Sequence, residues 1–569
     1  MTFSNIAQYA VFLLIVLVLV KPVGGYLARV FAGEKTFLNP LLRPVERSIY
    51  ALCRIDAEQE MTGKQYALAF VLFSLAGTLL LYAILRLQQF LPFYDPVHLV
   101  TPMTPDLAMN TAVSFSTTTT WQTYAGETTM SYTSQLVGLV AQNFLAGAGG
   151  LAVGIAFMRG FARQNSETLG NFWVDLVRGL LWVLMPASVL VSLVLVWQGV
   201  PMNFNPYTVA NTLGGGVQTI AQGPVAALES IKNLGTNGGG FFNVNGAHPY
   251  ENPTWLSNLI EMLSIAVIPA ALTNTFGRMV GRPRQGWLLF WVMVLLFLVA
   301  LGLGTWAEQS GNPALAPAVG ASQPNMEGKE VRFDIGGSIL TAVTTSNGAT
   351  GSTNSAHDSY TPLGGAVPLT NMFLGEMVFG GLGTGIYSIL MVALLGLFLT
   401  GLMIGRTPEY LGKRIEPSEM KLLAIYTLIG PLGVLALTAI AVATGPGLAA
   451  LTTNSGPHGL TEILYAYTSS FTNNGQTFGG LSSNSLFYNG TTVVAMLLGR
   501  FGLAIPALAF AGLFARQTSR PMTPGKLKTD SLLFASVIIG TALIVVALTY
   551  LPAMALGPII EHLRLVNGS

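Results

Sequence analysis

Charged residues are scarce in this sequence. Asp, Glu, Lys and Arg together make up 9% of its 569 residues, whereas hydrophobic residues make up 51%. Water-soluble domains carry about 25% charged residues, so the composition excludes an ordinary soluble globular protein. It indicates instead a protein that lies in a lipid bilayer, with lipid around most of its surface.

Cysteine and the signatures of nucleotide chemistry are also missing. The single cysteine, Cys53, excludes internal disulfides and cysteine-based metal sites. The five histidines share no metal-ligand spacing, and the sequence has neither a GxxxxGK[ST] loop nor the DKTG motif of P-type pumps. The sequence therefore predicts no catalytic residues, no nucleotide or organic cofactor on this chain and no nucleic-acid partner.

Long apolar runs recur along the chain. A helix needs about 20 apolar residues to cross about 30 Å of hydrocarbon, and by this measure we expect an all-α polytopic membrane protein with ten transmembrane helices. No small-residue cleavage site follows the first run, so we expect it to stay as a membrane anchor. The predicted spans are 6–27, 66–91, 132–161, 173–197, 255–276, 287–306, 372–404, 422–442, 491–514 and 532–554.

Basic residues predict the orientation of these spans. Of the 27 Lys and Arg residues, 21 lie in one set of loops and span ends, and cytoplasmic loops carry an excess of these residues. Ten spans then place both termini outside. On the outer side, twelve acidic residues against five basic ones predict a surface that attracts cations. The basic stretches are 21–64, 159–178, 278–284, 406–421 and 516–528.

Four long outer loops share one pattern. Each contains a moderately hydrophobic stretch that is too short to cross a membrane and is typical of a re-entrant helix, at 106–115, 224–234, 336–343 and 460–471. One Asn-Gly pair alone is more often a plain turn, but four recurrences in the same context favour a pore. The small and polar residues that follow the stretches read SFSTTTTWQ (114–122), LGTNGGGFF (234–242), TTSNGATG (344–351) and SFTNNGQTF (470–478).

These repeats define the predicted architecture. We expect four span–pore-loop–span repeats around a pseudo-fourfold pore, with one extra helix at each end. The segments are an N-terminal span with a basic cytoplasmic loop (1–65), repeat 1 (66–161), repeat 2 (173–276), repeat 3 (287–404), repeat 4 (422–514), and a basic loop with the C-terminal span (515–569).

The composition of the four polar stretches suits a cation. An ion that enters a membrane must exchange its water shell for oxygen atoms, which inward-facing backbone carbonyls can supply. Glycine lets those carbonyls turn toward an axis, and Thr and Asn side chains can brace the backbone from behind. K⁺, which is large and weakly hydrated, suits such a ring. The candidate filter residues are Thr118, Thr119, Thr120, Gln122, Thr236, Asn237, Gly238, Gly239, Gly348, Asn473, Asn474 and Gly475.

Small residues also cluster inside the seventh predicted span. Two interpretations remain open: close helix packing, which small residues favour in membranes, and a broken helix or intramembrane loop that blocks direct passage below the filter. In the third span, Gln135, Gln142 and Asn143 either line the same cavity or form interhelical hydrogen bonds. The clustered glycines are Gly380, Gly381, Gly383 and Gly385.

One basic residue, Arg500, lies deep within a predicted span. At about 1.5 Å per residue it lies about 14 Å from the start of the ninth span near residue 491. A buried arginine costs at least about 2.5–3.5 kcal/mol, so it should face the protein interior and have a partner. Glu376 in the seventh span is the candidate. Either Arg500 forms a positive barrier under the filter, or it bonds only to carbonyls and is structural.

Several motifs make the sequence resemble one family closely. They are LGTNGGGFFN (234–243), HPYENPT (248–254), NMEGKE (325–330), HDSYTPLGG (357–365), GEMVFGG (375–381), LMIGRTPEYLGK (402–413) and GRFG (499–502). On these motifs, and over essentially all 569 residues, the chain resembles the potassium-binding A subunit of the Kdp-type potassium-transporting ATPase, a relative of the Trk/Ktr family of potassium channels and transporters.

The sequence departs from the family pattern at two filters. The first filter of the family often carries asparagines where this chain has threonines. In the third filter, counting back from the HDS motif at 357–359 makes Thr350 and Gly351 the filter pair. The repeat pattern alone selects Asn347 and Gly348 instead. Both glycines are therefore kept as candidates.

The resemblance implies a subunit of a pump. Members of the family capture extracellular or periplasmic K⁺ in the filter and pass it through an intramembrane tunnel to a P-type ATPase subunit, and small single-span subunits complete the complex. This implies that the chain is no enzyme by itself, that K⁺ is the transported ion, and that ATP hydrolysis lies on a partner chain. The alternative is a stand-alone potassium channel or cation symporter of the Trk/Ktr type.

Overall fold

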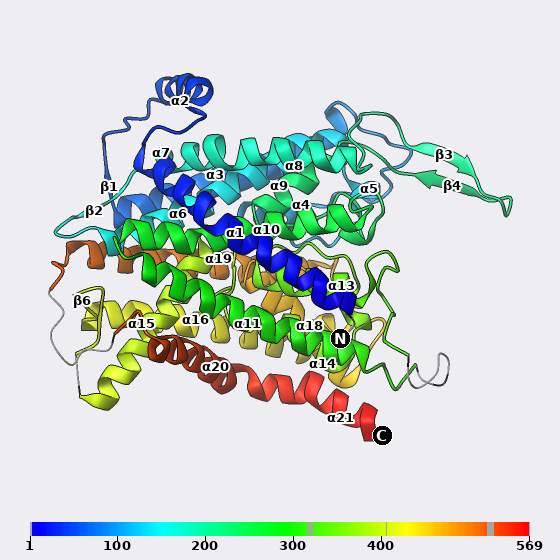
Figure 1. Ribbon diagram of the computed structural model, residues 1–569. Helices are drawn as coiled ribbons and strands as arrows, with labels where there is room; N and C mark the ends of the chain where they lie inside the picture. Colours follow the sequence, from blue (N-terminus) through cyan, green and yellow to red (C-terminus); the bar gives the residue numbers. More distant parts are fainter. Residues whose placement is uncertain (1–2, 316, 318–322, 406, 521–527, 568–569) are drawn as a thin grey trace.

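Ten long apolar helices make up most of the molecule (Figure 1). The computed structural model describes residues 3–567 except 316, 318–322, 406 and 521–527, so Arg406 and Lys526 of the basic stretches lie outside the described residues. Within the described part, ten helices are long and apolar enough to cross a membrane, which confirms the predicted number. They are α1 (Phe3–Ala32), α3 (Gly63–Leu87), α6 (Ala141–Ala162), α7 with α8 (Phe172–Arg178 and Met185–Trp197), α10 (Trp255–Met279), α11 (Pro283–Gln309), α15 (Thr384–Ile404), α16 (Pro417–Val442), α19 (Leu486–Arg516) and α20 (Leu532–Met554).

Shorter elements lie between the long helices. The four predicted re-entrant stretches are helical, and α13 and α18 extend beyond their predicted bounds. The three small two-stranded antiparallel sheets of the described part, and the helix α2 in the first basic loop, were not predicted. The short helices are α2 (Asn39–Cys53), α4 (Pro105–Ser116), α5 (Gly126–Thr129), α9 (Val225–Leu234), α13 (Asp334–Asn347), α14 (Pro362–Phe373), α17 (Gly445–Leu448), α18 (Gly456–Phe471) and α21 (Ile560–Asn567). The two-stranded sheets pair β1 (Met61–Thr62) with β2 (Thr168–Gly170), β3 (Thr208–Asn211) with β4 (Val217–Ile220), and β5 (Glu409–Tyr410) with β6 (Lys413–Arg414).

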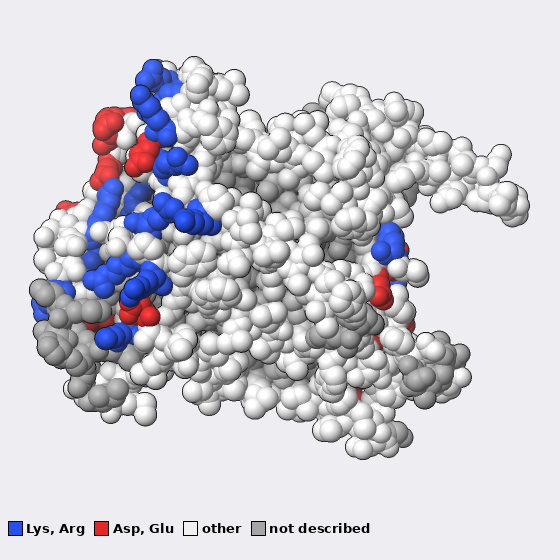
Figure 2. Space-filling view, viewed as in Figure 1, with Lys and Arg blue, Asp and Glu red and all other residues white. Residues whose placement is uncertain are grey.

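The two ends of the bundle differ in charge. In Figure 2 the Lys and Arg side chains gather at one end, around α2 and the paired strands β1 and β2, and the broad middle band of this face shows no charged side chain. Both chain termini lie at the other end, which also carries the projecting β3–β4 hairpin (Figure 1). An uncharged band between two polar ends is the surface expected of a protein that spans a bilayer.

The predicted seventh span, residues 372–404, is broken, as one of the two interpretations of its glycine cluster expected, and the membrane-length helix begins later than predicted. Helix α14 ends at Phe373 and α15 begins only at Thr384. Between them the backbone has positive φ at Gly375, Glu376, Phe379 and Gly383. Residues in this conformation cannot continue a right-handed helix, and glycine adopts it without steric cost. We call this segment, residues 374–383, the intramembrane loop.

Several charges predicted for the outer surface are buried in ion pairs instead. Lys232 on α9 has no exposed side-chain surface, and its Nζ lies 2.7 Å from carboxylate oxygens of both Glu229 and Glu251. Lys329 and Glu308 form a second buried pair at 2.7 Å. A charge buried in protein or hydrocarbon needs a partner close by, which explains these pairs. Because these acidic groups are buried, fewer of them lie on the outer surface than predicted.

The first buried cluster ties α9 to the chain that follows it. The second carboxylate oxygen of Glu251 accepts a hydrogen bond of 2.7 Å from the backbone N–H of Phe242. The Lys232 Nζ also donates to the Asn245 side chain at 3.1 Å. These bonds hold the chain after the glycines of residues 238–240 against the end of α9.

We expect Lys232→Met to destabilise the protein by about 3–5 kcal/mol, because removal of one partner leaves buried carboxylates uncompensated. The measurement is thermal unfolding of the purified full chain in detergent. The double variant Lys232→Met/Glu251→Gln should recover part of the loss, and Lys35→Met, at an exposed lysine, should stay within about 0.5 kcal/mol of the original protein. Unchanged unfolding of Lys232→Met would contradict this role of the cluster.

Candidate functional site

The four short helices α4, α9, α13 and α18 each end in the same backbone conformation. Each is followed by a three-residue segment whose first and third residues have positive φ, and we call these ring segments. Non-glycine residues at positive φ cost of order 1–3 kcal/mol and cluster at functional sites. The first residues are Thr118 (65°), Thr236 (47°), Ala349 (49°) and Asn473 (51°), and the third residues are Thr120 (53°), Gly238 (90°), Gly351 (70°) and Gly475 (82°).

Each ring segment is fastened to the helix that precedes it. The N–H of its middle residue donates to a carbonyl in the last turns of that helix, five residues back. These bonds use the N–H groups, so the oxygens are what the segments have left to offer a ligand. The bonds are Thr119 to Ser114 (2.9 Å), Asn237 to Lys232 (2.9 Å), Thr350 to Thr345 (3.2 Å) and Asn474 to Ser469 (2.9 Å).

The ring segments also contact one another in chain order. A Cβ placed on Gly238 would overlap the carbonyl oxygen of Thr350, and a Cβ on Gly351 would overlap that of Asn474. A Cβ on Gly475 would overlap the carbonyl oxygen of Thr119, so the fourth segment contacts the first. Glycine is required because another backbone approaches its Cα this closely.

The first segment makes the equivalent contact with a side chain. Thr120 stands where the other segments have glycine, and its Oγ1 donates to the carbonyl oxygen of Asn237 at 2.5 Å. The four segments thus form a closed ring in which the third residue of each meets the middle carbonyl of the next. A threonine hydroxyl replaces the direct backbone contact in this one place.

Of the two candidate glycines in the third stretch, only Gly351 lies in this ring. Gly348 follows the last residue of α13, with φ of −78°, and its N–H donates to Thr344. A Cβ there would meet Ile265 of α10. The selection of Asn347 and Gly348 by the repeat pattern is therefore wrong, because α13 continues through Asn347 and the polar ring segment begins later.

Asparagine side chains brace the ring as the composition predicts. The Asn474 amide donates to the carbonyls of Thr345 and Ser346 at 3.3 and 2.9 Å. The Asn473 amide donates to Thr119 Oγ1 at 2.8 Å, which links the fourth segment to the first.

Gln122 and Gly239 lie just beyond the ring rather than in it. The Gln122 amide accepts from the Gly240 N–H at 2.7 Å and donates to the Gly240 carbonyl at 3.2 Å. Gly239 packs against the Phe115 ring and Gln122. This pair of bonds joins the outer extensions of the first and second segments.

A cavity of about 750 Å³ lies on the outer side of the ring. Its floor includes the third ring residues Thr120, Gly351 and Gly475, and its wall includes Lys329 and Glu462. Burial lowers the pKa of Lys329, although its partner Glu308 opposes this shift. Burial raises the pKa of the Glu462 carboxyl to about 7.

A much smaller cavity lies on the inner side. The first residues of all four ring segments line it, together with Glu376, Gly381 and Arg500. Its volume of about 10 Å³ is close to the minimum that one water molecule needs. The ring thus lies between a wide outer cavity and a nearly closed inner one.

The intramembrane loop closes the inner cavity. The Leu382 N–H donates to Thr236 Oγ1 at 2.8 Å, directly below the second ring segment. A Cβ on Gly383 would overlap the carbonyl oxygen of Gly150 on α6, and Gly380 and Gly385 pack against each other. The helix is thus broken at the glycine cluster, and the break also packs closely, as the first interpretation expected.

Arg500 of α19 is 4% exposed and reaches the ring from below. Its guanidinium donates to Thr118 Oγ1 at 3.0 Å and to the carbonyl of Ala146 at 3.2 Å, and it lies 5.3 Å from the ring centre of Phe70. Among the described residues it forms no ion pair with Glu376, although both line the inner cavity. The predicted partner is therefore wrong, and the actual partners are a ring hydroxyl and one helix carbonyl.

The three polar residues of the third span do not line the inner cavity. The Gln135 amide donates to the Phe241 carbonyl at 3.4 Å. With its side-chain oxygen and nitrogen exchanged, Asn237 donates to the backbone carbonyl of Asn143 at 3.2 Å. These contacts favour the hydrogen-bonding interpretation for Gln135.

Sequence reasoning missed two kinds of residue at this site. Ala349 occupies the first position of the third segment, and counting two residues back from Gly351, as from Gly475 to Asn473, would have found it. Lys232 accepts the ring N–H groups through its carbonyl and holds Glu251 through its side chain, and no local pattern indicates the second contact.

The whole chain is similar to one set of known proteins. Residues 10–563 match the family model described as the potassium-transporting ATPase A subunit. The potassium-transporting ATPase potassium-binding subunits of Methylobacterium nodulans and Granulibacter bethesdensis are 53% and 50% identical, each aligned over 100% of this chain and over 99% and 100% of their own lengths.

A solved structure shows a similar fold at low sequence identity. The potassium transporter TrkH from Vibrio parahaemolyticus superimposes with a TM-score of 0.50 over 88% of this chain and 97% of its own, at 14% identity. That likeness concerns the fold alone. Because the family model covers nearly the whole chain and the relatives share half of its residues, the chain belongs to the potassium-transporting ATPase A subunit family.

Proposed function

We propose that this chain is the potassium-binding, channel-like subunit of an ATP-driven potassium uptake pump. One observation carries the proposal: four ring segments of equivalent backbone conformation close on one another between an outer and an inner cavity. The names of the relatives support K⁺ as the transported ion. The carbonyl oxygens of the ring segments would replace the water shell of the ion, because the middle N–H groups of these segments are already bonded to the preceding helices.

In this proposal the basic end of the bundle lies in the cytoplasm, and both termini lie outside. The excess of Lys and Arg in that set of loops supports this orientation. K⁺ would then enter the outer cavity from the extracellular or periplasmic side and reach the ring. The membrane would be the bacterial inner membrane.

Below the ring, the direct route to the cytoplasm is closed in this proposal. The intramembrane loop and the Arg500 guanidinium fill the space under the first ring residues, and a fixed positive charge repels K⁺. The ion would leave sideways, through an intramembrane tunnel, to a P-type ATPase subunit. Small single-span subunits would complete the complex, and ATP hydrolysis would lie on the partner.

The alternative function is a stand-alone potassium channel or cation symporter of the Trk/Ktr type. Uphill uptake separates the two. A pump subunit concentrates K⁺ only in the presence of its ATPase partner and ATP, whereas a symporter does so without either.

The glycines of the ring should determine ion selectivity. In Gly238→Ser or Gly475→Ser the new Cβ meets a neighbouring carbonyl, and a cost of about 1–3 kcal/mol at the site corresponds to about tenfold in affinity per 1.4 kcal/mol. We expect at least about tenfold weaker apparent K⁺ affinity and poorer discrimination against Na⁺ or Rb⁺ in transport assays of the reconstituted complex.

Gly214→Ser is the matched control, because nothing lies within 4 Å of a Cβ at Gly214 in the turn of the β3–β4 hairpin. If both ring variants transported K⁺ with the original affinity and selectivity, the filter assignment would be wrong.

The energy source should lie on the partner chain. We expect the isolated chain to bind K⁺ but neither to bind nor to hydrolyse ATP, because its sequence has no nucleotide-binding motif. Calorimetry with K⁺ and with ATP, together with a phosphate-release assay, measures both. ATP turnover by the highly purified single chain, in the absence of contaminating ATPase, would refute the expectation.

Arg500 should keep K⁺ transport coupled to ATP hydrolysis. Arg500→Met removes the charge under the ring, so we expect more ATP hydrolysed per ion moved, or a passive K⁺ leak in proteoliposomes. Arg500→Lys keeps the charge and should largely preserve coupling. A folded, assembled Arg500→Met complex with normal coupling and no leak would leave Arg500 only the structural bonds to Thr118 and Ala146.

A further inference from the structure

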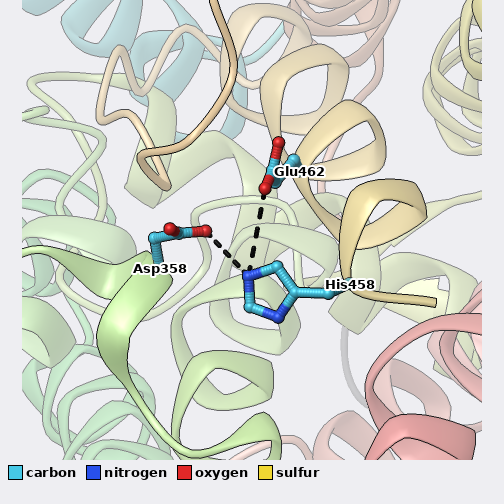
Figure 3. Close-up of side chains that lie close together, drawn as sticks. All are labelled: Asp358, His458 and Glu462. Carbon is cyan, nitrogen blue, oxygen red and sulfur yellow. Dashed lines mark hydrogen bonds and ion pairs between the residues drawn. The ribbon is translucent and has the colours of Figure 1, made fainter. Parts of the chain in front are cut away.

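A cluster of ionisable side chains lies at the outer end, away from the ring and the inner cavity (Figure 3). Asp358 comes from the turn before α14, and His458 and Glu462 come from the first turns of α18, four residues apart on one helix face. One ligand atom from each lies within 4.8 Å of the other two. The His458 Nε2 lies 2.7 Å from Asp358 Oδ1 and 4.0 Å from Glu462 Oε1.

The second nitrogen of the imidazole is held by another carboxylate. His458 Nδ1 lies 2.7 Å from Glu561 Oε1 on α21. Histidines that bind metals commonly donate their other ring N–H to a carboxylate, which fixes the tautomer and directs the free nitrogen at the metal. Here Glu561 leaves Nε2 directed at the two remaining carboxylates, as Figure 3 shows.

Glu462 carries a buried oxygen without a partner beside this cluster. Its side chain is fully buried. Oε1, the oxygen that lies 4.0 Å from His458 Nε2, accepts a hydrogen bond of 2.8 Å from Asn454, and Oε2 has no hydrogen-bond partner among the described residues. An unsatisfied buried carboxylate oxygen carries a desolvation cost that a bound cation would remove.

Two glycines leave room beside the carboxylates. A Cβ on Gly479 would meet the Asp358 side chain, and a Cβ on Gly480 would lie 2.5 Å from Glu462 Oε1. Both have positive φ, at 119° and 73°. An entry route exists as well, because the side chains of Asp358 and His458 are 21% and 19% exposed and Glu462 forms part of the outer cavity wall.

We infer that Asp358, His458 and Glu462 form a binding site for a divalent transition-metal ion, with Zn²⁺ as the class representative, and that Glu561 orients His458 from behind. One imidazole and two carboxylates are a ligand set for Zn²⁺, with bonds of about 2.0–2.2 Å and a water in the fourth position. Three carboxylates around one histidine also leave an excess of negative charge that a dication offsets. This inference departs from the sequence-based expectation of no metal-ligand spacing, because Asp358 lies 100 residues from His458.

A metal at this place would join three parts of the chain. Asp358 follows the third ring segment, α18 precedes the fourth, and Glu561 belongs to the C-terminal helix. The Asp358 N–H also donates to the Phe478 carbonyl at 2.8 Å, just beyond the fourth ring segment. The ion would therefore fix the outer wall of the cavity, away from the ring segments themselves, and the inference does not depend on the proposed function.

The test uses the full chain without a histidine tag, in lipid nanodiscs, depleted of metal with a chelator and then dialysed against Zn²⁺ in the presence of K⁺. We expect one Zn²⁺ per chain by elemental analysis, and a Zn absorption edge showing nitrogen and oxygen neighbours only. His458→Gln and Glu462→Gln should lose this equivalent, and Glu561→Gln, on the partly exposed rim, should weaken binding about 10–100-fold.

Two controls exclude other sources of bound metal. His98→Gln disrupts a His–Asp pair of the same 2.7 Å length that belongs to no three-residue ligand cluster within the described part of the chain, and Cys53→Ser removes the exposed thiol. Both should bind Zn²⁺ like the original chain. The inference is overturned if the original chain binds no stoichiometric Zn²⁺, if excess K⁺ displaces it, if Cys53→Ser abolishes it, or if Glu561→Gln and Glu462→Gln, folded by size-exclusion chromatography, bind it unchanged.

Discussion

Backbone N–H groups at membrane depth need partners within the protein, because hydrocarbon offers none. The ring segments obtain theirs from carbonyls in the last turns of α4, α9, α13 and α18. Other features of the site follow from this constraint. The long helices hold the short ones, the short helices take up the N–H groups, and the oxygens of the irregular segments are left for an ion.

The ring closes because backbone meets backbone with no side chain between. Gly238, Gly351 and Gly475 allow this at three contacts, and the Thr120 hydroxyl bridges the fourth. The absence of glycine from the first polar stretch is therefore compatible with the same arrangement. Positive φ at Thr120 and at the first residue of each segment is tolerated because the neighbouring segments and helices determine the backbone path.

Below the ring, the intramembrane loop and the buried Arg500 guanidinium both border the inner cavity. The intramembrane loop could not pack under the ring as a continuous helix, because its glycines lie against the backbone of α6 and against one another. Arg500 is tolerated in this interior because Thr118 and Ala146 accept its hydrogen bonds. The result is an inner cavity no larger than about one water molecule beneath a far larger outer one.

The sequence by itself determined the number of spans, the position of the short helices and the ring residues of three of the four stretches. These features depend on local hydrophobicity and on Thr, Asn and Gly in short patterns, which the chain displays directly. Only the tertiary structure decided that Gly351 and not Gly348 lies in the ring, that Arg500 bonds to Thr118, and that His458 meets Asp358 and Glu561. Those outcomes depend on side chains about 100 residues or more apart in the chain, or on where a helix happens to end, and local patterns do not encode such distances.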